Sequence, residues 1–130
     1  MSVFFDTNVI LYATEEQGRF RSTTLKLLNV GGVVSVQVLN ETTNVLRGKH
    51  QFDWVRVSTF LSAVRAKCDV VPLSVATHER GIVYAERFRL HIYDAMIVAS
   101  AVLAGCEVLY SEDMHDGLII DGLTISNPYR

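Results

Sequence analysis

The fold of this chain is indicated first by the stretch Val3-Phe4-Phe5-Asp6-Thr7-Asn8. Three apolar residues with high strand propensity are followed directly by an acid, which is typical of a short buried strand that ends in a carboxylate. A carboxylate next to buried apolar side chains is costly unless it has a partner, so Asp6 needs one. Acidic residues also follow other predicted strands of the chain within a few positions.

Strands and helices alternate along the sequence. Apolar runs predict strands at residues 3–5, 33–36, 70–71, 108–110 and 123–125. Helical spacing and capping residues predict helices at residues 22–30 and 38–46, after Asp53, from Ser74 to about residue 88, and at 92–104. This order favours an α/β fold, a three-layer α/β/α sandwich with a central, mostly parallel sheet of four or five strands. Ligands of such sheets bind beyond the carboxyl ends of the strands.

Length and composition exclude several classes of protein. The 130 residues fit one domain, residues 1–130, and no apolar run approaches the roughly 18 residues that a membrane span needs. The first residues lack the basic region of a signal peptide, so we expect a cytoplasmic protein with free, buried thiols at Cys68 and Cys106. With 12 Lys and Arg against 14 Asp and Glu, the chain is no strongly basic nucleic-acid binder. A nucleic-acid enzyme whose positive charge comes from metal ions stays open.

The acids near the predicted strand ends form the candidate site. They are Asp6 after the first strand, Glu41 in the helix after the second, Asp94 in the first turn of the apolar helix, and Asp113 and Asp116 after the fourth strand. No lysine lies in these turns, so clustered carboxylates would repel one another unless a cation bound them. A ligand set made of oxygens favours Mg²⁺ or Mn²⁺ over zinc, and such ions suit phosphate chemistry.

Each acid also has an ordinary structural explanation. Asp6 can cap a helix, and Asp94 is favoured by the dipole at a helix N-terminus. Glu41 can be a solvated helix residue, and Asp113 and Asp116 lie in a turn where acids are common. Each explanation accounts for one acid, but together they do not account for the cluster, because four unpaired acids at one edge of a sheet repel one another.

Two short polar residues accompany the acids. Asn8 lies two positions after Asp6, and Ser111 lies two positions before Asp113. Either can orient a carboxylate or bind phosphate, although ordinary turn polarity explains them equally well.

Four stretches of this sequence resemble the motifs of PIN-domain proteins, in the same order and spacing. They are Phe4-Phe5-Asp6-Thr7-Asn8-Val9-Ile10-Leu11-Tyr12, Ser35-Val36-Gln37-Val38-Leu39-Asn40-Glu41, Tyr93-Asp94-Ala95-Met96-Ile97-Val98-Ala99-Ser100-Ala101 and Tyr110-Ser111-Glu112-Asp113-Met114. Any one of them is a weak signal, whereas four in register are a strong one. The short, single-domain form is similar to the VapC-type toxins of toxin–antitoxin pairs.

The resemblance implies a metal-dependent endoribonuclease with an α/β/α sandwich. It also implies an RNA substrate, a homodimer, and inhibition by a small cognate antitoxin. It assigns Asp6, Glu41, Asp94 and Asp113 to the catalytic, metal-binding set for Mg²⁺ or Mn²⁺, with Asp6 and Asp94 as the most direct ligands. Asp116 is a looser match to an additional acid of some members.

Other functions remain to be weighed. A PIN fold that serves RNA processing or quality control fits the sequence as well as a toxin does. A phosphohydrolase with an aspartyl-phosphate intermediate is disfavoured because position 8 is Asn where a second Asp is needed. A receiver-like signalling module is disfavoured because the turn at residues 111–115 has no lysine.

Overall fold

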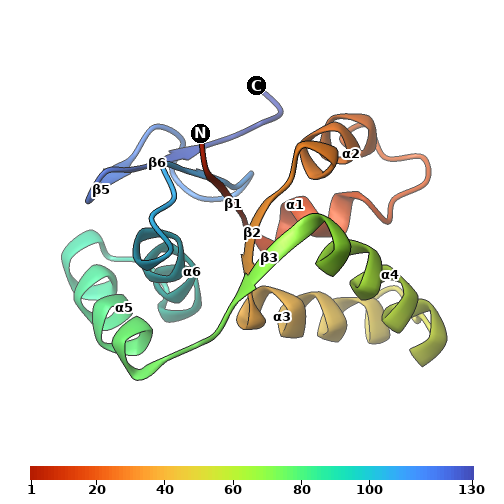
Figure 1. The fold of residues 1–130 in the computed structure, drawn as a ribbon, viewed down its shortest axis with the longest axis horizontal. Coiled ribbons are helices and arrows are strands. Elements are labelled where there is room, and N and C mark those ends of the chain that lie inside the picture. The colour runs from red at the N-terminus through yellow and green to blue at the C-terminus, as the bar shows by residue number, and fades with distance from the viewer.

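A computed structural model describes residues 1–130, and its centre is a six-stranded sheet (Figure 1). The strands are β1 (Val3–Phe5), β2 (Gly32–Ser35), β3 (Cys68–Val71), β4 (Val108–Tyr110), β5 (Ile119–Ile120) and β6 (Leu123–Ser126), in the order β3-β2-β1-β4-β6-β5. All neighbours pair in parallel except β5 and β6. The predicted α/β fold with a mostly parallel sheet is therefore confirmed, with six strands instead of four or five.

The additional strand, β5, forms a hairpin with β6. Asp121 and Gly122 connect the two strands with positive φ angles of 48° and 85°. Asp-Gly is the dipeptide that favours the tight turn of a two-residue hairpin. Apolar residues on both sides of Asp-Gly thus indicate a hairpin. The sequence prediction included the strand after this turn but not the strand before it.

Six helices connect the strands. They are α1 (Thr7–Tyr12), α2 (Arg21–Val30), α3 (Val36–Arg47), α4 (Trp54–Lys67), α5 (Val75–Phe88) and α6 (Ile92–Leu103). Asp53 and Ser74 cap α4 and α5 as predicted. Several boundaries differ from the prediction by one or two residues, and β3, for example, begins at Cys68 instead of residue 70. Two differences concern the elements that carry Asp6 and Glu41. Helix α1 is additional and begins directly after Asp6, and β2 ends at Ser35, because the Ser35 side chain caps α3 and makes Val36 helical.

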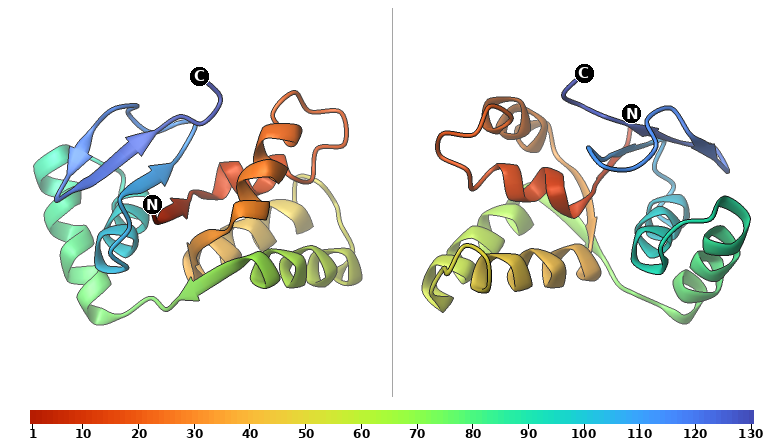
Figure 2. Two further views of the ribbon diagram at one scale, coloured as in Figure 1. Left: turned by 45° about the horizontal axis from the view of Figure 1, so that its top comes forward. Right: turned by 180° about the vertical axis from the view of Figure 1, so that it is seen from behind.

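The order of the strands determines which helices cover which face. The chain moves outward from β1 to β2 to β3, and then returns past β1 to β4. Right-handed crossovers therefore place α1–α4 on one face and α5 and α6 on the other, as Figures 1 and 2 show. The direction reverses between β1 and β4, and this switch point is where sheets of this kind bind ligands.

The core lies on both faces of the sheet. Phe4, Phe5, Val34 and Leu109 of the central strands are fully buried, and α6 is buried continuously over residues 95–101. Cys68 and Cys106 are free and buried, as predicted. None of the helices is both long and apolar enough to cross a membrane.

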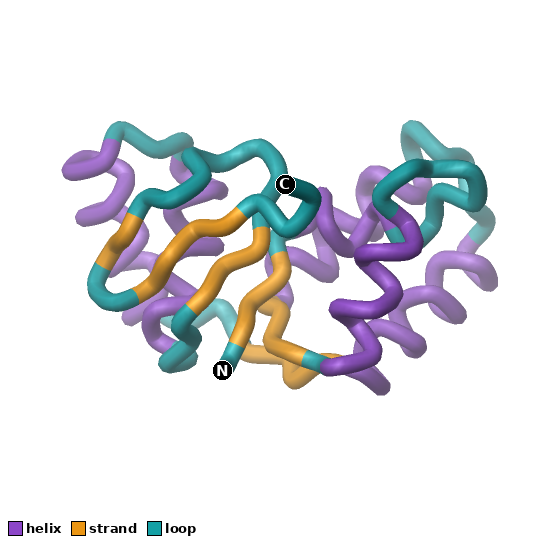
Figure 3. Tube along the Cα trace, turned by 90° about the horizontal axis from the view of Figure 1, so that it is seen from above, coloured by secondary structure: helices purple, strands orange, loops and turns teal.

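The carboxyl ends of the central strands lie next to the C-terminal segment. The backbone of Asp6 donates to the Tyr110 carbonyl oxygen (3.0 Å), and that of Ser111 donates to the carbonyl oxygen of Ser126 (3.1 Å). These bonds align the ends of β1, β4 and β6, and Figure 3 shows the terminal loop next to them. The residues after β1 and β4 are thereby fixed relative to one another.

Candidate functional site

Asp6 is held at the switch point by the backbone around it. It follows β1 and caps α1, where its Oδ1 accepts a hydrogen bond from the Thr7 N–H (2.7 Å). Only 4% of the residue is exposed. Burial raises the pKa of Asp6 to about 7, the bond from Ser111 opposes this rise, and the nearby charges of Asp113 and Asp94 add to it. Asp6 is therefore both a helix cap and a buried carboxylate whose negative charge a bound cation would stabilise.

Ser111 connects Asp6 with Asp113. Its hydroxyl oxygen is completely buried and lies 2.7 Å from Asp6 Oδ2 and 3.1 Å from Asp113 Oδ1. The same oxygen accepts a bond from the Met114 N–H (3.3 Å), which fixes it in the turn after β4. A hydroxyl has one proton, so it cannot donate to both carboxylates at the same time. Ser111 therefore donates to one carboxylate at a time, and the exposed Asp113 stays open to water or a cation.

Glu41 is positioned by two residues that the sequence analysis did not select. The Thr7 hydroxyl donates to Glu41 Oε1 (2.6 Å), and the Gln37 side-chain amide donates to Oε2 (3.3 Å). Gln37 is buried and also donates to the Tyr93 carbonyl oxygen (2.9 Å). A sequence signal for Gln37 existed, since residues four apart lie on the same face of a helix.

Asp94 brings the fourth carboxylate from α6, in the first turn of that helix. Burial raises its pKa, and the charges of Asp113 and Glu41 raise it further, whereas His91 lowers it. Asp94 thus lies within electrostatic range of acids from the ends of two other elements. Asp6, Glu41, Asp94 and Asp113 are brought to one end of the sheet from β1, α3, α6 and the turn after β4.

Asn8 and Asp116 have other partners. Asn8 Oδ1 accepts from the Glu112 N–H at 3.5 Å, so it contacts the turn that carries Ser111. Asp116 accepts from the Asn127 N–H (2.8 Å) and lies 3.6 Å from the Arg130 guanidinium. Asp116 therefore holds the C-terminal segment, and its role as an additional ligand stays a prediction.

The acids fit a divalent cation by charge and by donor type. The ion pairs of the structure are Arg80–Asp121 and Arg130–Asp116, so no Lys or Arg neutralises the four acids. Their ligand atoms are all oxygens, which suit Mg²⁺ or Mn²⁺. No three Asp, Glu, His or Cys side chains are already placed to hold an ion together. Binding would therefore require the carboxylates to move closer together.

A family comparison identifies the arrangement. The family model of the PIN domain matches residues 3–115. The chain belongs to the PIN-domain family. The predicted resemblance is confirmed, and all four motifs of this PIN domain lie within the matched residues.

Solved structures similar to this PIN domain include toxins and toxin–antitoxin complexes. A toxin–antitoxin complex from Klebsiella pneumoniae is 26% identical, with a TM-score of 0.75 and 98% of each chain covered. VapC20 of Mycobacterium tuberculosis, a toxin that cleaves the sarcin-ricin loop, is 20% identical, with a TM-score of 0.71 and coverage of 86% of this chain and 90% of its own. VapBC-1 from nontypeable Haemophilus influenzae is 14% identical, with a TM-score of 0.72 over 100% of both chains. A comparison with curated protein sequences gave no match.

Proposed function

We propose that this PIN domain is an endoribonuclease that depends on Mg²⁺ or Mn²⁺ and acts as the toxin of a toxin–antitoxin pair. One observation carries the proposal. Asp6, Glu41, Asp94 and Asp113 come from separate elements to the switch point of the sheet, and no Lys or Arg forms an ion pair with them. Such a site attracts a divalent cation, and with it a phosphate group of RNA.

In this proposal the acids hold the cation, and the neighbouring polar residues orient the acids. Asp6 and Asp94 would hold the cation most directly, with Asp113 and Glu41 completing the set. A divalent ion bound there would polarise the phosphoryl oxygen and lower the pKa of the attacking water. Ser111 orients Asp6 and Asp113 through its hydroxyl, while Thr7 and Gln37 hold the Glu41 carboxylate at the edge of the site.

The proposed partners follow from the similarity of this PIN domain to solved toxin–antitoxin structures. The similar structure from Klebsiella pneumoniae is a toxin–antitoxin complex, which supports a small antitoxin as inhibitor of this chain. We also propose a homodimer that acts in the cytoplasm. The net charge of −2 means that the chain has no overall positive field to attract RNA, so local positive sites must supply the attraction.

Cleavage of RNA tests the enzymatic part. Purified protein freed of any partner is incubated with a pool of structured RNAs in Mg²⁺ or Mn²⁺, in EDTA, or as Asp94→Asn. We expect discrete cuts that occur only with metal and wild-type protein. Equal cutting by Asp94→Asn, or in EDTA, would contradict the proposal. Thermal unfolding with and without Mg²⁺ gives a second readout, because the wild type alone should be stabilised by the ion.

Growth tests the assignment as a toxin. Induced expression of the wild type should arrest a bacterial culture, and co-expression of a small protein encoded next to the chain should restore growth. Asp94→Asn is the matched control and should not arrest growth. Metal-dependent cutting without growth arrest would favour an RNA-processing enzyme instead.

A further inference from the structure

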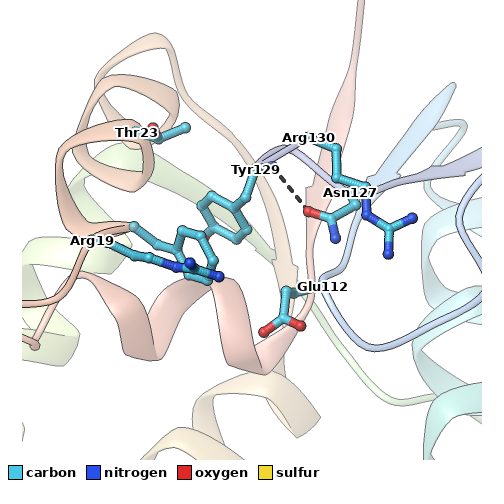
Figure 4. A pocket seen from close by; sticks show the side chains of 7 residues that line it. Arg19, Thr23, Glu112, Asn127, Tyr129 and Arg130 are labelled. Carbon is cyan, nitrogen blue, oxygen red and sulfur yellow. Dashed lines mark hydrogen bonds between the residues drawn. The ribbon is translucent and has the colours of Figure 1, made fainter.

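A hollow next to the acidic site has no role in the mechanism described so far. It has a volume of about 470 Å³ and lies between the start of α2 and the C-terminal segment (Figure 4). One of its lining residues is Glu112, which stands between Ser111 and Asp113 in the chain. The turn that carries two residues of the acidic site is therefore also a wall of the hollow.

One side of the hollow is aromatic and firmly held. The rings of Phe20 and Tyr129 stack with centroids 4.1 Å apart and planes at 19°. Tyr12 packs edge-on against both rings, at 5.0 and 5.4 Å. The Tyr129 hydroxyl shares a hydrogen bond with the buried Thr24 hydroxyl (2.6 Å), which fixes the ring to α2. Because Tyr129 and the Arg19 guanidinium already cover the Phe20 ring, Tyr129 is the ring of the hollow that can stack on a nucleobase.

The same hollow contains two guanidinium groups. Arg19 is exposed, lies 4.5 Å from the centroid of the Phe20 ring, and forms no ion pair. The Arg130 side chain is 73% exposed and lies 3.6 Å from Asp116. Figure 4 shows Arg19 on the aromatic side and Arg130 on the opposite side, with Glu112 between them. Glu112 accepts a hydrogen bond from the Tyr12 hydroxyl, and Arg130 is paired with Asp116, so Arg19 is the guanidinium of the hollow that has no acidic partner.

An amide completes the set of polar groups. Asn127 Oδ1 accepts from the Tyr129 N–H (2.9 Å), whereas its NH₂ group has no partner in the structure. A free amide donor beside aromatic rings can bond an acceptor on the edge of a base, and guanidinium groups bind phosphate oxygens.

We propose that this hollow binds one unpaired nucleotide of the RNA substrate, next to the phosphodiester at the acidic site. Arg19 and Arg130 contact phosphate, and the base lies against the Phe20–Tyr129 side. The proposal rests on the proposed ribonuclease function and adds a site for a neighbouring nucleotide. An acidic peptide would use the two arginines but not the aromatic side and the amide, so RNA fits more of the hollow.

Binding of RNA tests the role of Arg19. The probe is a fluorescein-labelled single-stranded RNA decamer of random sequence, and binding to Asp94→Asn protein in Mg²⁺ is followed by anisotropy at several salt concentrations. In the Asp94→Asn background, Arg19→Gln should weaken RNA binding about 5- to 10-fold. The slope of log binding constant against log salt concentration should become shallower by roughly 0.7, the value for one lost contact with single-stranded phosphate. Arg87→Gln on α5 removes another exposed arginine, far from the hollow in sequence, and should change neither quantity.

Two variants of Tyr129 test the aromatic side. Tyr129→Leu should weaken binding of the decamer about tenfold, because stacking on the ring is lost. Tyr129→Phe keeps the ring and should bind RNA like its parent, although it loses the bond to Thr24. If Tyr129→Leu proves to be unfolded by circular dichroism, Arg19→Gln decides the question by itself, since its side chain is exposed.

The outcomes separate this proposal from the proposed function. Equal RNA binding by the Arg19→Gln and Arg87→Gln proteins, or no binding of the decamer at all, would overturn the nucleotide site. If Arg19→Gln weakens binding of a deca-glutamate peptide but not of RNA, the nucleotide site is also overturned, and the hollow is a protein-docking site instead. Metal-dependent cleavage by wild type tests the nuclease on its own. If Arg19→Gln in the wild-type background cuts RNA at the wild-type rate, only the nucleotide site fails.

Discussion

Asp6 and Glu41 reach the same end of the sheet, but the fold surrounds them differently. Asp6 is buried and shares the Ser111 hydroxyl with Asp113. Glu41 is partly exposed and receives bonds from two neutral donors, one on each carboxylate oxygen. Burial without a cation penalises a negative charge, whereas two donors stabilise one. We therefore expect metal to gain most of its binding energy at Asp6, and Glu41 to contribute mainly by its position.

The largest expected effect is that of Asp6→Asn. RNA cleavage should fall by about a thousandfold or more, because a ligand for an ion worth several kcal/mol is lost. The rise in unfolding temperature caused by Mg²⁺ should disappear as well. Asp116→Asn is the matched control, since Asp116 binds the C-terminal segment, and it should retain most of the activity. A loss as large as that of Asp6→Asn would place Asp116 among the ligands.

The pH dependence of stability tests the cost of burying Asp6. Burial raises the pKa of Asp6 in the folded state to about 7, above its ordinary value of 3.8. The folded state therefore binds the proton more tightly, and this stability is present below about pH 4 and lost as the pH rises through 7. Without metal, the free energy of unfolding should fall across this window by up to roughly 4 kcal/mol.

Urea unfolding in EDTA between pH 4 and 8 measures this effect. Asp6→Asn should remove most of the dependence on pH and be more stable than wild type at pH 8. An unchanged pH profile in this variant would show that Asp6 is not the group responsible. Mg²⁺ at pH 8 should restore stability to the wild type only.

Glu41→Gln should have a smaller effect on cleavage than Asp6→Asn. We expect a loss of about 10- to 100-fold, because the charge is removed while the Thr7 hydroxyl can still bond the side chain. Single-turnover cleavage of the same RNA at saturating Mg²⁺ measures it. If the two variants lose equal activity, the distinction between the buried and the partly exposed carboxylate is wrong.

The smallest effects belong to the residues that orient the acids. Ser111→Ala should weaken Mg²⁺ binding by about tenfold, since loss of a partner that orients a ligand costs 10- to 100-fold. Thr7→Val removes only the donor to Glu41 and should cost a few-fold. Calorimetric titration with Mg²⁺ measures both affinities. A larger loss for Thr7→Val than for Ser111→Ala would reverse the proposed ranking of Asp6 above Glu41.

The sequence predicted most of the elements because their signals are local. Apolar runs marked the strands, and capping residues such as Asp53 and Ser74 marked the starts of helices. Helix α1 was missed because its six residues are too few to show a helical period, and the Asp121-Gly122 hairpin was overlooked. The boundary after β2 was displaced because Val36 suits a strand, whereas the Ser35 cap makes it helical.

By itself, the sequence determined that acids stand at the ends of separate strands and helices of a parallel sheet. Only the tertiary structure decided their partners. The bond from Ser111 to Asp6 spans 105 positions and that from Thr7 to Glu41 spans 34, so both depend on strand register and on rotamers set by packing. The hollow at Arg19 likewise joins the start of α2 to the C-terminal segment. A local pattern fixes where a side chain stands in its own element, but contacts between elements arise only when the whole sheet forms.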